Sequence, residues 1–302
     1  MEGIMIGLER GTVKLLPYDP QWAELGHMHC KRIEEALLPW AFKVVHVGST
    51  GVPGLVAKPI IDIAVAIGRF DDQTVSAVVS AMESAGYLYR PNAGNEKQML
   101  FVEADGEWRS AHIHVVGYMS MEWYNYINFK HYLIAFPKVR DAYAALKTEL
   151  AEKYPNDRES YTAAKADFIR FVLRKAMVHS YLGKLIDAKV DRPVGYVHGK
   201  GDKTLVYPIN YGYIPGVLGG DDEELDVYFL GEDKPLESFS GKVIAIVHRE
   251  DDVEDKLVAC PIEMNFTAEQ ICEQILFQEQ YYNTTIETYD GKMTHISAGR
   301  KS

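Results

Sequence analysis

The sequence is poor in cysteine and has no long apolar run. Its three cysteines, Cys30, Cys260 and Cys272, are an odd number without a paired or zinc-like spacing, which argues against a disulfide scaffold and suits a reducing compartment. No stretch approaches the about eighteen uninterrupted apolar residues of a membrane-spanning helix. The N-terminus lacks the charged and apolar regions of a signal peptide. We therefore expect a cytoplasmic protein that has no membrane partner.

Negative charge is concentrated in the second part of the chain. Residues 1–180 contain 20 Lys and Arg against 21 Asp and Glu, whereas residues 181–302 contain 12 against 22, a net charge of −10. Such a surface repels nucleic acid, and no stretch interleaves basic and aromatic residues, so we expect no nucleic-acid partner. A divalent metal ion is the simplest neutraliser of this charge, although an ordinary solvated acidic face gives the same counts.

With 47% apolar residues in 302, the chain can bury two cores. Three- and four-residue apolar spacing predicts a helix from Pro20 to Pro39 and further helices over 72–85, 121–134, 137–153 and 159–180. Apolar runs predict strands over 44–47, 59–67, 99–102 and 111–116. Beyond 180–185 the pattern predicts short strands over 186–192, 204–209, 225–230, 241–248 and 256–261, and a helix over 267–281 with a capping box. We therefore predict an α+β chain of two domains: 1–180 with a mixed sheet and helices, and 181–302 with a small β-barrel and a C-terminal helix.

Two acidic clusters in the second part have the chemistry of a hard-metal site. Asp221, Glu223 and Asp226 can converge, because a turn brings the first two to one side and Asp226 begins the next strand. A second cluster, 251–255, precedes Lys256. Mg²⁺ prefers carboxylate oxygens together with water and phosphate, and two metal ions can convert a bridging water to hydroxide. Ordinary acidic loops between strands have the same spacing, so both interpretations stay open.

The motifs of this region occur in a recognisable order. YPINYGYIPG is followed by DDEELD, by GKVIAIV and by EDKLVACP. In order and spacing these runs resemble the soluble family I inorganic pyrophosphatases, which carry a Y-P-x-N-Y-G-x-I segment, a D-G-D-P-x-D metal motif and a later D…D-x-K before a V-A-V-P strand. The resemblance implies a pyrophosphatase or OB-like barrel that binds Mg²⁺, or Mn²⁺, through Asp221, Glu223, Asp226, Asp251 and Glu254. It also implies that Asp226 acts with the phosphate-binding residues Lys256, Tyr207 and Tyr211.

Two kinds of departure from that family pattern matter. Glu223 and Glu254 stand where the family has Asp, which keeps the charge but adds a methylene to each metal position. The family's upstream K-x-E pair and phosphate-binding Arg have no registered match, although Arg192, Lys200 and Lys203 precede the Tyr-Pro segment. Hydrolysis of a phosphoanhydride needs cations on the leaving phosphate as well as metal. The hypothesis is an Mg²⁺-dependent hydrolase of pyrophosphate or another phosphoanhydride; the alternative is a protein that binds nucleotide or phosphate without catalysis.

The first part has a Gly-Ser turn and a strand carboxylate. The turn at 48–50 follows a strand, Lys58 comes next, and Asp62 lies thirteen residues after Ser49 on the following strand. Backbone amides freed by such a turn can approach phosphate, and the carboxylate can hold a metal ion against it. A tight β-turn is the structural alternative.

His112 and His114 alternate on a predicted strand and face the same side, so with Asp62 they could form a two-His, one-carboxylate metal site. A half-buried, hydrogen-bonded histidine pair is the alternative. Arg109, just before them, could neutralise a phosphate or form a surface ion pair.

Four separated runs carry a second resemblance: PYDPQW, HVGSTGVPGLVAKPIIDIAV, HIHVV and YTAAKADFIR. Over residues 13–175 they resemble the GrpB (UPF0157) family, which is similar to the nucleotidyltransferases. The nucleotidyltransferase pattern has two alternate carboxylates on the strand, and here Ala64 stands in place of the second. The resemblance implies a nucleotide at Gly48, Ser49, Thr50, Lys58 and Arg109. A transfer reaction there would release pyrophosphate for the second part. The sequence leaves open the substrate and whether the chain forms a homo-oligomer.

Overall fold

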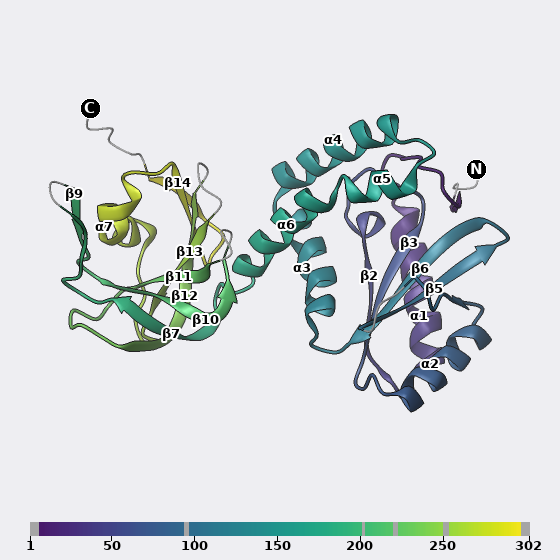
Figure 1. Cartoon of the computed structure of the whole chain (residues 1–302), viewed down its shortest axis with the longest axis horizontal. Helices are drawn as coiled ribbons and strands as arrows, with labels where there is room; N and C mark the ends of the chain where they lie inside the picture. The colour runs from purple at the N-terminus through teal and green to yellow at the C-terminus, as the bar shows by residue number, and fades with distance from the viewer. Residues whose placement is uncertain (1–5, 94–96, 201–202, 220–222, 250–253, 297–302) are drawn as a thin grey trace. The chain divides into compact units, whose positions relative to one another are not determined.

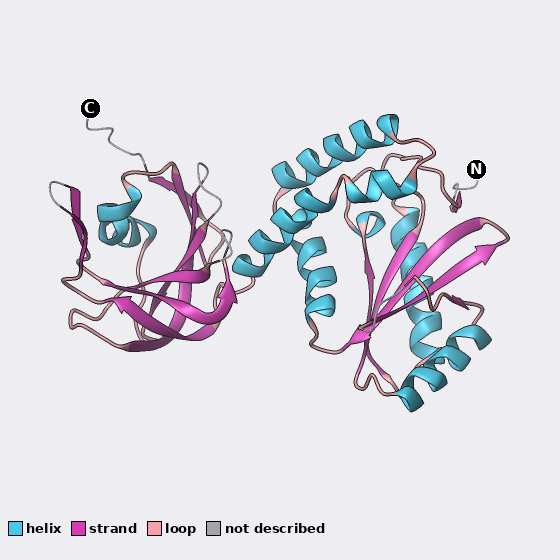
Figure 2. Ribbon diagram, in the orientation of Figure 1, coloured by secondary structure: helices cyan, strands magenta, loops and turns pink. Residues whose placement is uncertain are grey.

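The computed structural model describes residues 6–93, 97–200, 203–219, 223–249 and 254–296. The chain divides into two compact units, Met1–Leu173 and Arg174–Ser302, which we call the first and the second unit. Figures 1 and 2 show their helices and strands. Within the described ranges, no helix is both long and apolar enough to span a bilayer.

The first unit is a mixed sheet flanked by helices (Figure 2). Its strands pair in the order β2-β3-β6-β5-β4, with β1 on β6; β3 and β6 are parallel and the other pairs antiparallel. The strands are β1 (Leu8–Glu9), β2 (Ala41–Val47), β3 (Ile61–Ile67), β4 (Leu88–Tyr89), β5 (Gln98–Asp105) and β6 (Trp108–Gly117). The helices are α1 (Gln21–Ala36), the 3-10 turn η1 (Ser49–Gly51), α2 (Asp72–Ser84), α3 (Met121–Ala135), α4 (Pro137–Lys153), α5 (Arg158–Ala163) and α6 (Ala166–His179), which continues into the second unit.

Alternation along β3 separates the main core from the face that carries polar residues. The odd-numbered residues of β3 are buried against α1 and α2. Ala64 and Ala66 pack with Trp123 of α3 on the opposite face. Because successive side chains of a strand point to opposite faces, Asp62 shares the α3 face.

The second unit is a five-stranded closed barrel. Its strands pair in the order β13-β11-β10-β7-β12, and β12 pairs again with β13 to close the ring; β14 and β15 extend the sheet from β12, and β8 and β9 form a separate hairpin. The elements are β7 (Leu185–Arg192), β8 (Val197–Lys200), β9 (Lys203–Val206), β10 (Asn210–Leu218), β11 (Glu224–Phe229), β12 (Ser238–Arg249), β13 (Asp255–Cys260), α7 (Ala268–Glu279), β14 (Thr284–Thr288) and β15 (Met293–Ile296).

The strands of the barrel are apolar on both faces. Leu225, Val227 and Phe229 of β11 belong to a cluster drawn from all five barrel strands, which is the barrel interior. The alternate residue Tyr228 packs with Ile271 and Ile275 of α7 in another cluster. The helix therefore covers one outer face of the barrel, and Asp226 lies on that face by the same alternation.

The predicted fold class, α+β with a mixed sheet, a barrel and a C-terminal helix, is confirmed, and Thr267 and Gln270 form the predicted capping box. The helix predicted over 159–180 is two helices, α5 and α6, separated by a turn at Ala164 and Lys165. The prediction missed β10, since the turn-forming residues Gly212, Pro215 and Gly216 lie within it. It also missed β14 and β15.

Candidate functional site

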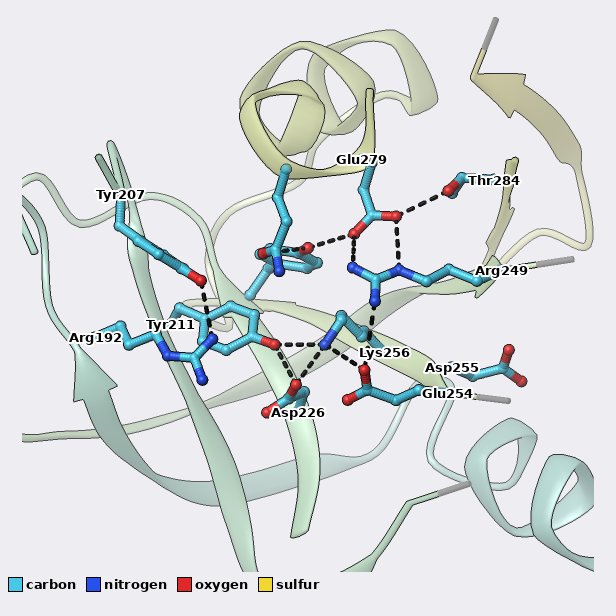
Figure 3. Close-up of polar contacts among 12 residues, drawn as sticks. Arg192, Tyr207, Tyr211, Asp226, Arg249, Glu254, Asp255, Lys256, Glu279 and Thr284 are labelled. Atoms are coloured by element: carbon cyan, nitrogen blue, oxygen red, sulfur yellow. Dashed lines mark hydrogen bonds and ion pairs between the residues drawn. The ribbon is translucent and has the colours of Figure 1, made fainter. Parts of the chain in front are cut away.

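Side chains from three strands of the second unit meet beneath α7 (Figure 3). Tyr211 of β10 and Lys256 of β13 both donate hydrogen bonds to Oδ2 of Asp226 on β11. The Lys256 amine also donates to the Tyr211 hydroxyl at 2.5 Å and lies 2.8 Å from Oε2 of Glu254. Glu254 and Lys256 reach the same place because residues two apart in extended chain point the same way. Four of the residues singled out from the sequence thus form one cluster.

The charges of this cluster are strongly coupled. Burial, together with a hydrogen bond to Asp226, raises the pKa of Glu254 to about 8. Burial also opposes ionisation of Asp226, but hydrogen bonds from Glu254 and Tyr211 and the charge of Lys256 outweigh it and hold the Asp226 pKa below its usual value. At neutral pH the cluster therefore has Asp226 ionised and Glu254 protonated, so Lys256 balances one negative charge.

Ion pairs hold the neighbouring side chains in place (Figure 3). Arg249 of β12 donates to both carboxylate oxygens of Glu279 on α7, at 3.1 and 2.7 Å, and lies 3.4 Å from Glu254. Asp255 points to the opposite face of β13, where its oxygens lie 2.6 Å from Lys175 and 3.2 Å from His248. Contacts on both faces therefore keep Glu254 and Lys256 directed toward Asp226.

Arg192, which had no registered place in the sequence pattern, belongs to this cluster. Its guanidinium donates to the Tyr207 hydroxyl at 2.9 Å and lies 4.9 Å from the centre of the Tyr211 ring. Strand register places Arg192, at the end of β7, opposite Tyr211 on β10. Gly212 permits this close pairing, since a Cβ there would collide with the backbone of β7. Recognising β10 as the partner of β7 would have identified Arg192 from the sequence.

Three further metal ligands were predicted for the second unit. Asp221 and Asp251 lie outside the described residues, and Glu223 is exposed just before β11. Among the described residues, no group of three or more His, Cys, Asp or Glu side chains could hold a metal ion. The metal-binding set of the second unit therefore stays a prediction.

In the first unit, the Gly-Ser turn lies directly against the strand carboxylate. Gly48 has a φ of 65°, and a Cβ at this position would lie 2.5 Å from Oδ2 of Asp62. Glycine is thus required both by the backbone conformation and by the approach of Asp62. The Thr50 hydroxyl donates to the Ile60 carbonyl oxygen at 3.2 Å, which ties the turn to the start of β3.

His112 and His114 lie beside Asp62, as the alternation predicted, but they bind its carboxylate. His112 Nδ1 is 3.3 Å and His114 Nε2 3.5 Å from the same oxygen, Asp62 Oδ1. Burial opposes ionisation of Asp62, but hydrogen bonds from the two histidines outweigh it and lower its pKa. Burial lowers the pKa of His112, so this ring is neutral at pH 7. In this structure the two imidazoles and the carboxylate are hydrogen-bonded to one another. The two-His, one-carboxylate metal site stays a prediction.

A cavity of about 370 Å³ opens next to Asp62, and Gly48, Ser49, Thr50 and Lys58 line it. The nucleotide contacts expected of these residues stay a prediction. Arg109 does not line the cavity. Its guanidinium donates to the Gly106 carbonyl oxygen at 2.7 Å, in the turn between β5 and β6, so this placement does not support the expected phosphate contact. Three further basic residues, which no pattern in the sequence singled out, also line the cavity: Lys147, Arg158 and Lys165.

Comparisons with known proteins match the two units to different families. Residues 12–175 match the family model GrpB protein, and residues 194–289 match the model Inorganic pyrophosphatase. Both resemblances seen in the sequence are confirmed, the second with later bounds.

Individual relatives align with the first unit. The Glutamate-rich protein GrpB of Alkalihalophilus pseudofirmus is 32% identical over 174 residues, which are 57% of this chain and 99% of the relative. The UPF0157 protein PA4798 of Pseudomonas aeruginosa is 34% identical over 168 residues, 55% of this chain and 68% of the relative. The crystal structure of the conserved protein GrpB from Enterococcus faecalis covers 56% of this chain and 99% of its own, with a TM-score of 0.52 and 27% identity. The chain therefore belongs to the GrpB family, and its second unit carries a region that matches the inorganic pyrophosphatases.

Proposed function

We propose that the second unit is a divalent-metal-dependent hydrolase of phosphoanhydrides, with pyrophosphate as the first substrate to test. The observation that carries this proposal is the convergence of Asp226, Glu254, Lys256, Tyr211 and Arg192 beneath α7. The hydrolysis needs oxygen ligands for a metal ion and cations for the phosphate oxygens, because charge develops on both sides of the P–O bond that breaks, and the cluster contains both kinds of group. The match of residues 194–289 to the pyrophosphatase model supports it.

The donor atoms of the cluster suit Mg²⁺ or Mn²⁺. Asp226 and Glu254 provide only oxygen ligands, which hard cations prefer, and together they hold more potential negative charge than Lys256 can balance. We propose that these two residues hold the metal, with Asp221, Glu223 and Asp251 completing the set. When bound, Mg²⁺ lowers the pKa of a coordinated water and so supplies the nucleophile.

Arg192, Tyr211 and Lys256 are the residues that would meet the phosphate oxygens. Arg192 is a fixed cation, since its guanidinium rests on Tyr207 and Tyr211. Burial raises the pKa of Tyr211 well above its ordinary value, so its hydroxyl stays a hydrogen-bond donor at neutral pH. The three N–H groups of Lys256 are directed at both carboxylates and at Tyr211, so its contribution to phosphate binding is its positive charge and not a further hydrogen bond.

The test measures phosphate release from pyrophosphate and from a small panel of nucleotides, with EDTA, Mg²⁺ or Mn²⁺. Wild-type protein should release phosphate only with metal, and Asp226→Asn should lose about 100-fold or more of this activity, because the variant removes a charge from the proposed metal site. Asp233→Asn is the matched control, since Asp233 is an exposed acid outside the cluster. If the folded, metal-loaded wild type releases no phosphate from any substrate, the hydrolase proposal fails and the non-catalytic binding alternative takes its place.

A further inference from the structure

We propose that the cavity of the first unit binds an organic phosphate through lysine amines and without a divalent metal ion. This site is separate from the hydrolase cluster of the second unit, and neither proposal depends on the other. Three features of the cavity support this: the charge balance of its wall, the contacts of its amines and the character of the remaining wall.

Positive charge dominates the wall. Of the described lining residues, Lys58, Lys147, Lys165 and Arg158 are basic and Asp62 alone is acidic. The Asp62 carboxylate is already occupied by His112 and His114. Gathering like charges in a partly dry cavity is unfavourable unless an anion compensates them. A divalent cation would meet net positive charge here, so the lining selects against metal and for an anion.

The contacts of the amines leave donors available. Lys147 is satisfied by the protein, because it donates to the Ser49 hydroxyl at 2.9 Å and to the Val56 carbonyl oxygen. Among the described residues Lys58 and Lys165 contact no carboxylate, and their amines lie 5.6 and 4.2 Å from the centre of the Tyr161 ring. An aromatic face attracts a cation but does not use up its N–H groups as an acceptor oxygen would. Two amines therefore face the cavity with hydrogen bonds to offer.

Burial and neighbouring positive charge lower the pKa values of both Lys58 and Lys165. Burial, reinforced by the neighbouring Arg158, lowers the pKa of Lys58 to about 8. Burial and the charge of Lys58 lower the pKa of Lys165, also to about 8. Each amine is still mostly protonated at pH 7, and a bound anion would raise both pKa values.

The chemistry of the wall defines the class of ligand. Two amines and a guanidinium match an oxyanion with two or more negative charges, as in a phosphate monoester or diphosphate, whereas a single carboxylate would leave cations uncompensated. Much of the remaining wall is apolar or aromatic, and the cavity volume of about 370 Å³ is that of a small-molecule site. The apolar lining residues include Tyr126, Phe129, Tyr143, Ile169 and Leu173. An organic group beside the phosphate is therefore part of the proposal.

The test is calorimetric titration of the full chain in EDTA with AMP, ADP, inorganic phosphate and inorganic pyrophosphate. AMP or ADP should bind at one site per chain without metal. Lys165→Met should weaken binding by about tenfold or more, the loss of one charge-assisted hydrogen bond. Asp226→Asn, in the second unit, should leave this binding unchanged. Equal affinity for inorganic pyrophosphate and ADP would overturn the claim that the cavity binds an organic group beside the phosphate. A strict requirement for metal would overturn the claim that lysine amines bind the phosphate without a divalent ion.

A second readout keeps the proposal testable whichever probe binds. Because Lys165 is an uncompensated cation, Lys165→Met should raise the melting temperature of the unliganded protein by about 2–4 °C, as expected where stability is sacrificed for a ligand. Lys138→Met, at an exposed lysine of α4, should change neither stability nor binding. A Lys165→Met protein that binds every probe as the wild type does and melts at or below its temperature would overturn the proposal.

Discussion

Addition of Mg²⁺ should make the second unit release close to one proton per chain at pH 7, and this proton should come from Glu254. The structure places Glu254 beside the ionised Asp226, and burial together with their hydrogen bond raises the Glu254 pKa to about 8. A carboxylate must be ionised to serve as a metal ligand, so metal binding there has to expel the proton.

The size of the effect follows from this pKa. A carboxyl group with a pKa of about 8 is about 90% protonated at pH 7, about half protonated at pH 8 and about 10% protonated at pH 9. Proton release should therefore fall from about 0.9 per site at pH 7 to about 0.1 at pH 9. Below pH 7 the apparent affinity for Mg²⁺ should fall about tenfold for each pH unit, because each binding event must remove one proton.

Calorimetry in two buffers with different heats of ionisation measures this release directly, since the observed heat varies with the buffer in proportion to the protons exchanged. Glu254→Gln should abolish the dependence on buffer, while Asp233→Asn should retain it. The reasoning is refuted if wild type binds Mg²⁺ at pH 7 with no proton release, or if Glu254→Gln releases as much as wild type does.

Two further predictions concern stability. Gly48→Ala should lower the free energy of unfolding by more than Gly86→Ala does. Both residues have a positive φ, so both substitutions cost about 1–3 kcal/mol of backbone strain, but only a Cβ at Gly48 collides with Asp62, whereas nothing lies within 4 Å of one at Gly86. Equal losses of stability in urea unfolding would contradict the required approach of Asp62. His248 donates hydrogen bonds to Asp255 and Glu287, and these bonds and the charges of the two carboxylates outweigh the burial of His248 and raise its pKa to about 9. Its charged form should therefore contribute about 3 kcal/mol of stability below pH 6.5. This contribution should disappear as the pH rises from 6.5 through 9, and His248→Gln should remove that part of the pH dependence of stability. If the stability of the wild-type protein is constant between pH 6.5 and 9, the ion pairs of His248 do not stabilise the fold.

The sequence predicted those elements whose apolar pattern is regular. The alternating residues of β3 and the helical spacing of α1 are strong local signals, because burial of one face determines both periods. β10 gave no such signal, since Gly212, Pro215 and Gly216 interrupt it and the strand survives through its pairing with β7 and β11. The break between α5 and α6 was missed for the opposite reason: the helical spacing continues across Lys165 although the chain turns there.

The candidate site of the second unit was predictable to the extent that its residues are close in sequence. Glu254 immediately precedes β13 and Lys256 lies two residues further along the extended chain, so their common direction follows from local geometry. Arg192 lies on another strand and reaches the cluster only through the register of β7 with β10, which is a property of the fold. For the same reason Arg249, which links Glu254 to α7, gave no signal in the sequence.

The basic cavity of the first unit shows why the charge of a domain does not reveal the charge of its site. Residues 1–180 are almost neutral in sum, yet Lys58 before β3, Lys147 on α4 and Lys165 between α5 and α6 surround one cavity in which Asp62 is the acid among the described lining residues. The second unit shows the reverse: it is strongly acidic in sum, yet its cluster contains a buried lysine and an arginine. A phosphate ligand can be neutralised by amines directly or by carboxylates through a metal ion, and these two solutions leave opposite electrostatic signatures. If each unit uses the solution that its side chains favour, EDTA should abolish catalysis by the second unit and leave ligand binding by the first unit intact.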